Sequence, residues 1–432
     1  MVKGYLVIFF LLSSCATGLA QSSIDELTDD YLEVTSFDQK KKAAKKIIAS
    51  KIAFQEAFSK LSRGKRYSEK VKRGFFEMKQ EGERLPPAAL ILVPHDYSPE
   101  KKYSLRVFLH GAVSTINPQF VYHMIDTLNE AYRKTQSINI YPSAWTWAPW
   151  WSDVQYENIN RLVDQVKQQY NVNENDIRLG GVSDGGTGSF YLANCNMTLW
   201  SCITPFIGFE KLVDVLPVRT IYSGNFSNGS FYVVNTAKDH LFPVREVIPY
   251  HQLLKKINPT AVTAVVDSSG HNLRWLPVLR DSIEQYAIKH QRNPFPDKLN
   301  WTTDSEKKYN RFRYVIINQL GSVKPGKMQD EYNEITVNGK KQQAHKRDSV
   351  YGHLKAETTG NTVKVKTSNV KKYTLLISPS QFDLSKPIIV WTNEKKSFER
   401  LVQPDIKTLL KWNMIDNDRT SLYGAEIQIS VK

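Results

Sequence analysis

Metal and cofactor motifs are missing from this 432-residue sequence. It contains three cysteines, no P-loop and no dinucleotide-binding glycine pattern, and no zinc-type spacing links His110, His240 and His271. It also has no internal repeat and no low-complexity tract. With 41% hydrophobic and 23% charged residues, the composition is that of a globular protein. We therefore expect one large domain with additions, or two domains, working without a metal or cofactor.

The N-terminus has the features of an export signal. Lys3 precedes an apolar run at residues 5–12 that is too short to span a membrane. Two cleavage interpretations stay open: Leu12-Ser13-Ser14-Cys15 resembles a lipobox whose Cys15 is lipidated, whereas Gly18-Leu19-Ala20 suits ordinary signal peptidase. Both predict an extracytoplasmic protein that is periplasmic, secreted or lipid-anchored, with membrane attachment only through Cys15.

Positive charge is concentrated near the start of the chain. The formal net charge is +15, and residues 38–73 hold thirteen Lys and Arg against three acidic residues. Apolar residues recur beside these charges at helical spacing: Ile47, Ile48, Ile52, Phe54 and Phe58. Because no nucleic-acid motif accompanies the segment, we interpret it as the solvated face of helices and expect no nucleic-acid partner.

Short apolar runs then alternate with amphipathic ones. The runs predict strands at residues 89–93, 104–109, 138–141, 177–181, 201–207, 231–235 and 262–266. The amphipathic segments predict helices at 118–134, 156–170, 184–193, 245–257 and 278–289. Several strands are apolar throughout, as in a sheet covered by helices on both faces. This pattern predicts an α/β domain with a mainly parallel sheet.

Beyond about residue 300 the sequence predicts mostly extended segments. They lie at 312–318, 361–367, 372–377, 387–392 and 426–431, with a helix at 406–412, and two prolines in residues 293–297 mark a linker. The expected organisation is a signal segment (1–20), a basic helical preface (21–85), a catalytic domain (86–292) and a smaller, mostly β C-terminal domain (300–432).

The stretch IRLGGVSDGGTG, residues 177–188, places five glycines around Ser183 where a predicted strand meets a predicted helix. Glycines allow a strand and a helix to approach closely and hold a serine in a strained turn above the sheet. A glycine-rich turn of this kind also suits phosphate binding or packing alone. The serine interpretation therefore depends on finding a base and a carboxylate elsewhere in the chain.

Both partners follow Ser183 in the sequence. Asp239 comes after the strand predicted at 231–235, and His271 comes after the strand predicted at 262–266. The carboxyl ends of parallel strands line one crevice, so the three side chains are expected to converge there. An oxyanion would be stabilised by backbone N–H groups, which we assign to Asp184 and to Ala112 after the His110-Gly111 strand end.

On these residues the chain resembles the α/β-hydrolase family, more narrowly its secreted esterase and peptidase-like branch, which includes polyhydroxybutyrate-depolymerase-like and feruloyl-esterase-like proteins. The resemblance covers about residues 86–292. Its motifs are Leu92-Val93-Pro94, Tyr97, His110-Gly111, residues 181–186, Phe242-Pro243 and Gly270-His271. It implies a Ser183 nucleophile, a His271 base that then acts as acid, and an orienting Asp239. Many members have glycine where Asn235 stands, which leaves Asp267 as a second choice for the carboxylate.

Four tryptophans lie within residues 145–151, in a loop expected above the same crevice. Trp145 and Trp147, with His110, are candidates to meet the carbohydrate, phenolic or acyl-chain part of an ester; filling the gap to another part of the chain is the alternative. Cys195 and Cys202 either form a disulfide that closes one loop or remain separate thiols.

The sequence therefore predicts an exported serine hydrolase that cleaves carboxylic esters through an acyl-enzyme. A peptidase of the same fold is the alternative. A non-catalytic glycan-binding or surface-interaction protein on a hydrolase scaffold is the second alternative. The sequence does not determine the oligomeric state.

Overall fold

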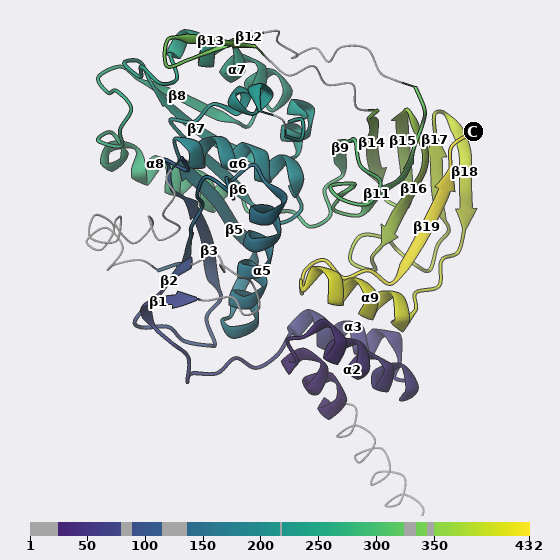
Figure 1. The fold of residues 1–432 in the computed structure, drawn as a ribbon. Coiled ribbons are helices and arrows are strands. Elements are labelled where there is room, and N and C mark those ends of the chain that lie inside the picture. The colour runs from purple at the N-terminus through teal and green to yellow at the C-terminus, as the bar shows by residue number, and fades with distance from the viewer. Residues whose placement is uncertain (1–24, 79–88, 115–135, 217, 324–333, 344–349) are drawn as a thin grey trace, which may run out of the picture. The chain divides into compact units, whose positions relative to one another are not determined.

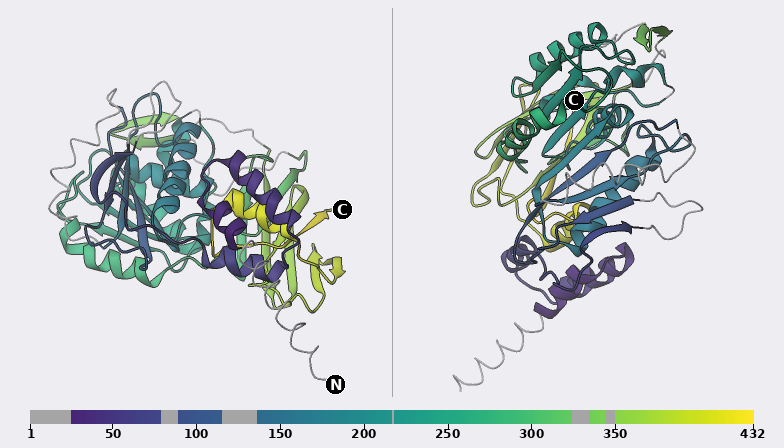
Figure 2. Two further views of the ribbon diagram at one scale, coloured as in Figure 1. Left: turned by 90° about the horizontal axis from the view of Figure 1, so that it is seen from below. Right: turned by 90° about the vertical axis from the view of Figure 1, so that its left-hand side faces the viewer.

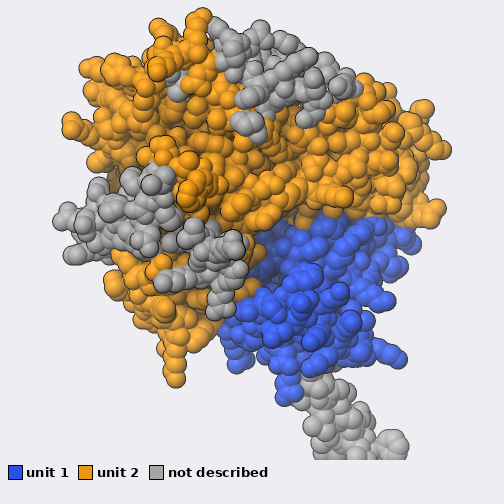
Figure 3. All heavy atoms as spheres, in the orientation of Figure 1, with its two compact units in different colours: residues 1–66, 376–385, 401–426 blue, residues 67–375, 386–400, 427–432 orange. Residues whose placement is uncertain are grey.

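The computed structural model describes all residues except 1–24, 79–88, 115–135, 217, 324–333 and 344–349 (Figure 1). The expected signal segment, Cys15 and the helix expected at 118–134 lie outside the described residues. Among the described helices, none combines the length and the apolar character that crossing a membrane requires. The described chain falls into two compact units, coloured separately in Figure 3.

An eight-stranded sheet forms the centre of the larger unit (Figure 1, Figure 2). Its order is β1-β2-β4-β3-β5-β6-β7-β8. The strands are β1 Gly74–Met78, β2 Ala89–Val93, β3 Tyr103–Leu109, β4 Ile138–Pro142, β5 Val172–Val182, β6 Cys202–Phe206, β7 Ser230–Thr236 and β8 Val262–Val266. β2 runs antiparallel to both neighbours, and β4, β3, β5, β6, β7 and β8 are parallel. The mainly parallel sheet expected from the sequence is therefore present.

Helices connect the parallel strands: α5 Asp153–Gln169, α6 Asp184–Cys195, α7 Val244–Ile257 and α8 Leu276–Lys289. α5 begins where the Ser152 hydroxyl accepts a hydrogen bond from the Gln155 N–H. Strands β2 and β4 are buried at every position, as expected for strands covered on both faces. The apolar runs of the sequence thus correspond to the buried core of this sheet.

The smaller unit comprises residues 1–66, 376–385 and 401–426. Its described helices are one that includes residues 25–33, α2 Phe37–Ala49, α3 Phe54–Arg63 and α9 Ile406–Asp416. Ile47, Ile52 and Leu61 are buried in one apolar cluster with Leu409 and Leu410 of α9. The helices expected in the preface are present, but the unit differs from the expected division at residues 85 and 300. Burial of the apolar faces of α2 and α3 requires α9, which comes from the other end of the chain.

The remaining strands form further sheets. A five-stranded sheet has the order β18-β17-β15-β14-β9, a four-stranded sheet the order β10-β11-β16-β19, and β12 pairs with β13. The strands are β9 Lys298–Thr303, β10 Arg311–Phe312, β11 Val315–Leu320, β12 Glu334–Val337, β13 Lys340–Gln343, β14 Gly352–Thr359, β15 Thr362–Ser368, β16 Val370–Ile377, β17 Ile388–Thr392, β18 Lys395–Arg400 and β19 Ala425–Ser430. Buried and exposed residues alternate along β14, so one face of the five-stranded sheet is packed and the other meets solvent.

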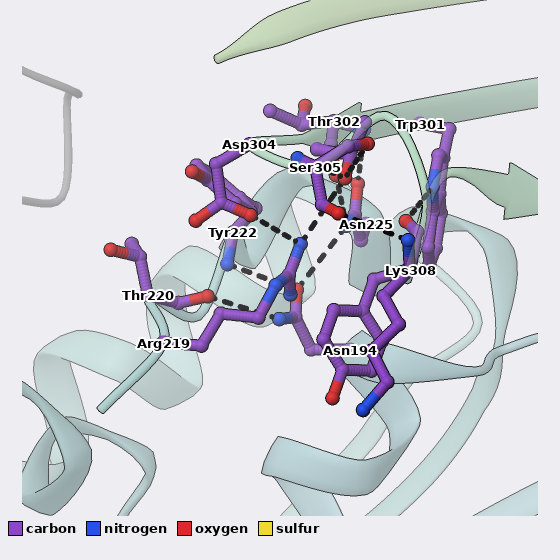
Figure 4. A network of polar contacts seen from close by, with 12 residues as sticks. Asn194, Arg219, Thr220, Tyr222, Asn225, Trp301, Thr302, Asp304, Ser305 and Lys308 are labelled. Carbon is purple, nitrogen blue, oxygen red and sulfur yellow. Dashed lines mark hydrogen bonds and ion pairs between the residues drawn. The ribbon is translucent and has the colours of Figure 1, made fainter. Parts of the chain in front are cut away.

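A polar network ties this five-stranded sheet to the part of the larger unit that holds the eight-stranded sheet (Figure 4). Arg219 lies between the rings of Tyr222 and Tyr309, its guanidinium 5.4 Å and 4.6 Å from their centroids, and its Nη2 lies 3.0 Å from Asp304 Oδ1. Beside it, Asn225 donates to the Thr302 carbonyl and accepts from the Thr302 N–H. These paired bonds between a side-chain amide and a backbone peptide group fix β9 against the segment that carries Arg219 and Asn225.

Candidate active site

Ser183 occupies a strained turn between β5 and α6. Its φ of 58° and ψ of −121° are unusual for a residue with a side chain. The turn is possible because the backbones around it approach closely: a Cβ on Gly185 would lie 2.1 Å from the Leu109 carbonyl oxygen, and one on Gly181 would lie 2.3 Å from that of Gly185. No side chain fits at either position, so these two glycines allow Ser183 to stand above the sheet.

The side chains of Ser183, His271 and Asp239 form a hydrogen-bonded relay. His271 Nε2 lies 2.8 Å from Ser183 Oγ, and His271 Nδ1 lies 2.7 Å from Asp239 Oδ2. The Asp239 side chain is completely buried. Its other oxygen accepts hydrogen bonds from the N–H groups of Leu241 and Phe242 at 2.8 Å and 3.0 Å. With one oxygen held by the backbone, the other is directed at the imidazole.

Asp267, the second choice for the carboxylate, does not take this position. Its side chain is exposed, whereas His271 is bonded to Asp239. Asn235, which stands where many members of the resembled family have glycine, is held by hydrogen bonds of its own. It is buried, donates to the Gly208 carbonyl and accepts from His251 Nε2, each at 3.0 Å. Burial lowers the pKa of His251 to about 4, so this histidine is neutral near pH 7.

Bonds between the acid loop and the histidine loop hold the relay in register. Thr236 Oγ1 donates to the Gly270 carbonyl at 2.8 Å, and the Lys238 N–H donates to the Ser269 carbonyl at 3.1 Å. The Phe242 ring meets the His271 imidazole in a T-shaped contact, with centroids 5.6 Å apart. Sequence reasoning noted Phe242 and Gly270 only as motif residues and assigned no role to Thr236, Lys238 or Ser269. The one sequence signal for these contacts was that the Asp239 loop and the His271 loop follow consecutive strands of a predicted parallel sheet, which brings the two loops close together.

The two backbone segments that carry the expected oxyanion donors lie beside Ser183. The first bond of α6 runs from the Thr187 N–H to the Ser183 carbonyl, so the N–H of Asp184 has no acceptor within the helix. On the other side, Ala112 has a φ of 56°, and a Cβ on Gly111 would lie 3.6 Å from Ser183 Oγ. The loop that carries Ala112 therefore lies next to the nucleophile candidate.

The side chain of Asp184 has a role that the sequence did not reveal. Its Oδ2 accepts a hydrogen bond from the Val113 N–H at 2.9 Å, which ties the Ala112 loop to the start of α6. Burial raises the pKa of this carboxyl. The bond occupies the N–H of Val113, so this residue is not the donor of the expected oxyanion site.

His110 is a structural residue and does not line a substrate site, contrary to the sequence-based expectation. It is only 1% exposed. Its Nε2 accepts from the Ala144 N–H at 3.0 Å, and its Nδ1 donates to the Gly111 carbonyl at 2.5 Å. With both ring nitrogens bonded to backbone, the imidazole holds the Ala112 loop to the tryptophan loop.

The tryptophans divide into packing and exposed residues. Trp145 is 5% exposed, which corrects its assignment to substrate contact, while Trp147 is 73% exposed. Trp150 is fully buried, donates from Nε1 to the His110 carbonyl and packs where a Cβ on Gly188 would lie 2.4 Å from its own Cβ. Gly188 is therefore required by this packing. Thr146 donates to the Ser114 carbonyl, so Trp147 belongs to a loop that contacts the Ala112 loop.

The two cysteines are not bonded to each other, which settles the sequence-based alternatives in favour of separate thiols. Cys195 ends α6, and Cys202 lies in an apolar cluster with Tyr232, Trp275 and Tyr286. Burial raises the pKa of both thiols to about 12. Neither thiol is therefore a reactive group at neutral pH.

Within the described residues, no group of three or more His, Cys, Asp or Glu side chains could hold a metal ion. The mainly parallel sheet, its helical connections and the strand–turn–helix that carries Ser183 define an α/β-hydrolase fold.

Comparisons with known proteins gave structural likenesses only, since no family model and no curated protein matches the sequence. A thermostable esterase is 16% identical with a TM-score of 0.41, covering 50% of this chain and 62% of that protein. Est1E from Butyrivibrio proteoclasticus is 13% identical with a TM-score of 0.39, covering 50% of this chain and 98% of that protein. S-formylglutathione hydrolase from Staphylococcus aureus is 15% identical with a TM-score of 0.40, covering 50% of this chain and 99% of that protein. The chain thus spans less than two thirds of the thermostable esterase.

Proposed function

We propose that this protein is a serine hydrolase that cleaves carboxylic esters. The observation that supports this proposal is the relay from Asp239 through His271 to Ser183, with heavy-atom distances of 2.7 Å and 2.8 Å. A serine hydroxyl becomes nucleophilic when a base removes its proton as it attacks, and the base needs a carboxylate to orient it. All three parts are present, with Ser183 on the strained turn before α6 and Asp239 and His271 in the loops after β7 and β8.

In the proposed mechanism, His271 Nε2 accepts the proton of Ser183 Oγ as the oxygen attacks the ester carbonyl. The backbone N–H groups of Asp184 and Ala112 stabilise the resulting oxyanion. The imidazolium, stabilised by Asp239, then gives its proton to the departing alcohol and leaves an acyl group on Ser183. Water, deprotonated by His271, attacks this ester. As the second tetrahedral intermediate collapses, His271 returns the proton to Ser183 Oγ, which releases the acid and restores the serine hydroxyl.

Trp147 is our candidate for substrate contact. It is the exposed aromatic of the tryptophan loop, and this loop is bonded to the segment next to the proposed oxyanion site. An exposed indole suits a sugar ring, a phenolic group or an acyl chain. Ala substitution of Trp147 should therefore raise KM for an ester that carries such a group more than for a short aryl ester.

The decisive experiment uses a fluorophosphonate probe, which reacts with an activated serine, on the wild type and on Ser183→Ala. We expect labelling and hydrolysis of short aryl esters by the wild type alone. A panel of peptide amides in the same assay distinguishes an esterase from a peptidase. A folded wild type that is neither labelled nor active would contradict the proposal and favour a binding function on a hydrolase scaffold.

We also propose an extracytoplasmic location, on the sequence features of the first twenty residues alone. If Cys15 carries lipid, Cys15→Ala should move the protein from the membrane fraction to the soluble fraction. If fractionation is unchanged and the mature chain starts at Gln21, ordinary signal-peptide cleavage is supported instead.

A further inference from the structure

A groove of about 1020 Å³ lies on the five-stranded sheet, and no member of the Ser183 relay lines it. Its floor is the exposed face of β9, β14, β15 and β17, and its side wall is η3, Ser223–Asn228, with the last residue of α7. All of these elements belong to the larger unit. The sheet is seen beside the hydrolase-type sheet in Figure 1.

The wall of the groove is fixed to its floor by hydrogen bonds. The Asn300 N–H of β9 donates to Asn228 Oδ1 at 2.9 Å, and Asn300 Nδ2 donates to the Gly224 carbonyl at 3.0 Å. Asn228 Nδ2 in turn donates to the Asn300 carbonyl. Side-chain amides that satisfy backbone groups in both directions make this a constructed junction, so the groove keeps its shape in the unbound protein.

Lysines dominate the floor of the groove. Lys355 on β14 stands directly opposite Lys366 on β15, and Lys364 lies two residues before Lys366 on the same face. All three are exposed, and among the described residues none of them lies within ion-pair distance of a carboxylate. Like charges directly opposite each other destabilise a sheet. A bound anion would remove this cost.

An aromatic surface continues the lysine row. Trp391 on β17 pairs in register with Lys364, and its indole is half-buried, with Lys396 Nζ 5.7 Å from the ring centroid. Across the same row, Glu357 pairs with Lys364 and forms an ion pair with Lys298 at 3.3 Å. Stacking on a flat indole and pairing with separate ammonium groups are the two contacts that a charged sugar chain can make.

The details of the groove distinguish between kinds of polyanion. Two glutamates, Glu357 and Glu394, line it together with four lysines, which disfavours a densely charged chain such as a nucleic acid. Single strands also require several stacking aromatics, and Trp391 is the one aromatic among the described lining residues. A bilayer surface is flat, whereas this site is a groove bounded on one side by η3. A chain with about one carboxylate per sugar fits these features.

We propose that this groove binds a polyuronate, an acidic polysaccharide with carboxylate-bearing sugars. The carboxylates pair with Lys355, Lys364 and Lys366, and one sugar ring stacks on Trp391. This binding site is additional to the proposed hydrolase site and does not depend on hydrolysis there.

Binding of polygalacturonate to the full chain carrying Ser183→Ala tests the proposal, because this background separates binding from ester cleavage. The test variant adds Lys355→Gln, Lys364→Gln and Lys366→Gln. The matched control adds Lys102→Gln, Lys289→Gln and Lys371→Gln, three exposed lysines outside the groove that change the net charge equally. Thermal unfolding of each variant verifies that the fold is retained.

We expect the groove variant to bind polygalacturonate about tenfold more weakly, as loss of three ion pairs implies, and the control variant to change by less than about twofold. Fully methyl-esterified polygalacturonate, the uncharged counterpart, should bind weakly to every variant. Equal losses in the groove and control variants would overturn the proposal. So would preferred binding of single-stranded DNA, a densely sulfated glycan or anionic vesicles, or the absence of polygalacturonate binding.

Discussion

The eight-stranded and five-stranded sheets carry their chemistry in different places. In the first, the candidate catalytic residues lie beyond the carboxyl ends of β5, β7 and β8, and strands such as β2 and β4 are buried throughout. In the second, alternate residues of β14 and β15 point to solvent, and the lysine groove lies on the face of the sheet.

This difference has a physical cause. A parallel sheet covered by helices has no free face, so polar side chains can gather only in the loops at its ends. The five-stranded sheet is antiparallel except for the parallel pair β15 and β17, and it is packed on one side only. Such a sheet presents a row of side chains every second residue on its free face, and this row matches a ligand that extends along the surface. The two proposed sites differ in the same way: the Ser183 site would act on a single bond, and the lysine groove would bind a chain.

The largest effect is expected at the relay. Asp239→Asn should lower kcat on a short aryl ester by about 10⁴-fold, because an amide favours the wrong tautomer of His271. Asp267→Asn is the matched control and should leave kcat unchanged, since its side chain is exposed and His271 bonds to Asp239. Steady-state kinetics of the two variants provide the measurement. An equal loss from Asp267→Asn would show that the carboxylate has been misassigned.

Packing around the Ser183 turn should tolerate no added atom. Gly185→Ala places a Cβ 2.1 Å from the Leu109 carbonyl oxygen, so we expect it to cost about 1–3 kcal/mol of unfolding free energy or more, and to displace Ser183. Gly224→Ala in the groove wall meets only Asn300 Nδ2 at an ordinary 3.7 Å and should be nearly neutral. Urea unfolding of both variants compares the two regions. Similar losses of unfolding free energy in the two variants would mean that the Ser183 turn is less tightly packed than these distances indicate.

Each sheet region contains a histidine whose pKa burial lowers from 6.5 to about 4: His251 in α7 and His353 in β14. Between about pH 6.5 and about pH 4, each of these histidines is protonated in the unfolded chain and neutral in the folded chain, so stability falls as the pH drops. From about pH 7 to about pH 5.5, His251 should account for about 1 kcal/mol of this loss.

The variant His251→Gln cannot titrate and should reduce the fall in stability by that amount, and His353→Gln should reduce it by a similar amount because burial lowers its pKa to the same value. Denaturant unfolding at the two pH values tests both. An unchanged pH dependence in His251→Gln would mean that His251 titrates normally in the folded protein.

The smallest effect concerns the lysine row. Lys366→Glu replaces a like-charge pair with Lys355 by an opposite-charge pair and should stabilise the protein by about 0.2–1 kcal/mol. The same change should weaken polygalacturonate binding. Higher stability with weaker binding would show that the lysine row lowers the stability of the fold but contributes to ligand binding. A stability gain with unchanged binding would show instead that it is an ordinary solvated face.

The sequence predicted much of the α/β sheet because its strands are continuous apolar runs, and β2 and β8 coincide with the expected segments. β1 and β9 were missed, since neither has a comparable apolar run. His110 and Trp145 were misassigned because a strand-end histidine and a loop tryptophan have the same local sequence whether they face a ligand or the core. The lysine groove was not predicted, because Lys355 and Lys366 become opposite only through strand register.

The sequence alone determined the parallel strands β3 to β8 and the helices α5 to α8 in their chain order, the glycine-rich turn at Ser183 and the positions of Asp239 and His271 after their strands. These follow from local periodicity and from steric limits on single residues. Only the tertiary structure decided that Asp239 rather than Asp267 meets His271, that Cys195 and Cys202 stay apart, and that α9 completes the core of the N-terminal helices. Contacts between residues far apart in the chain depend on packing and register, which no local pattern records.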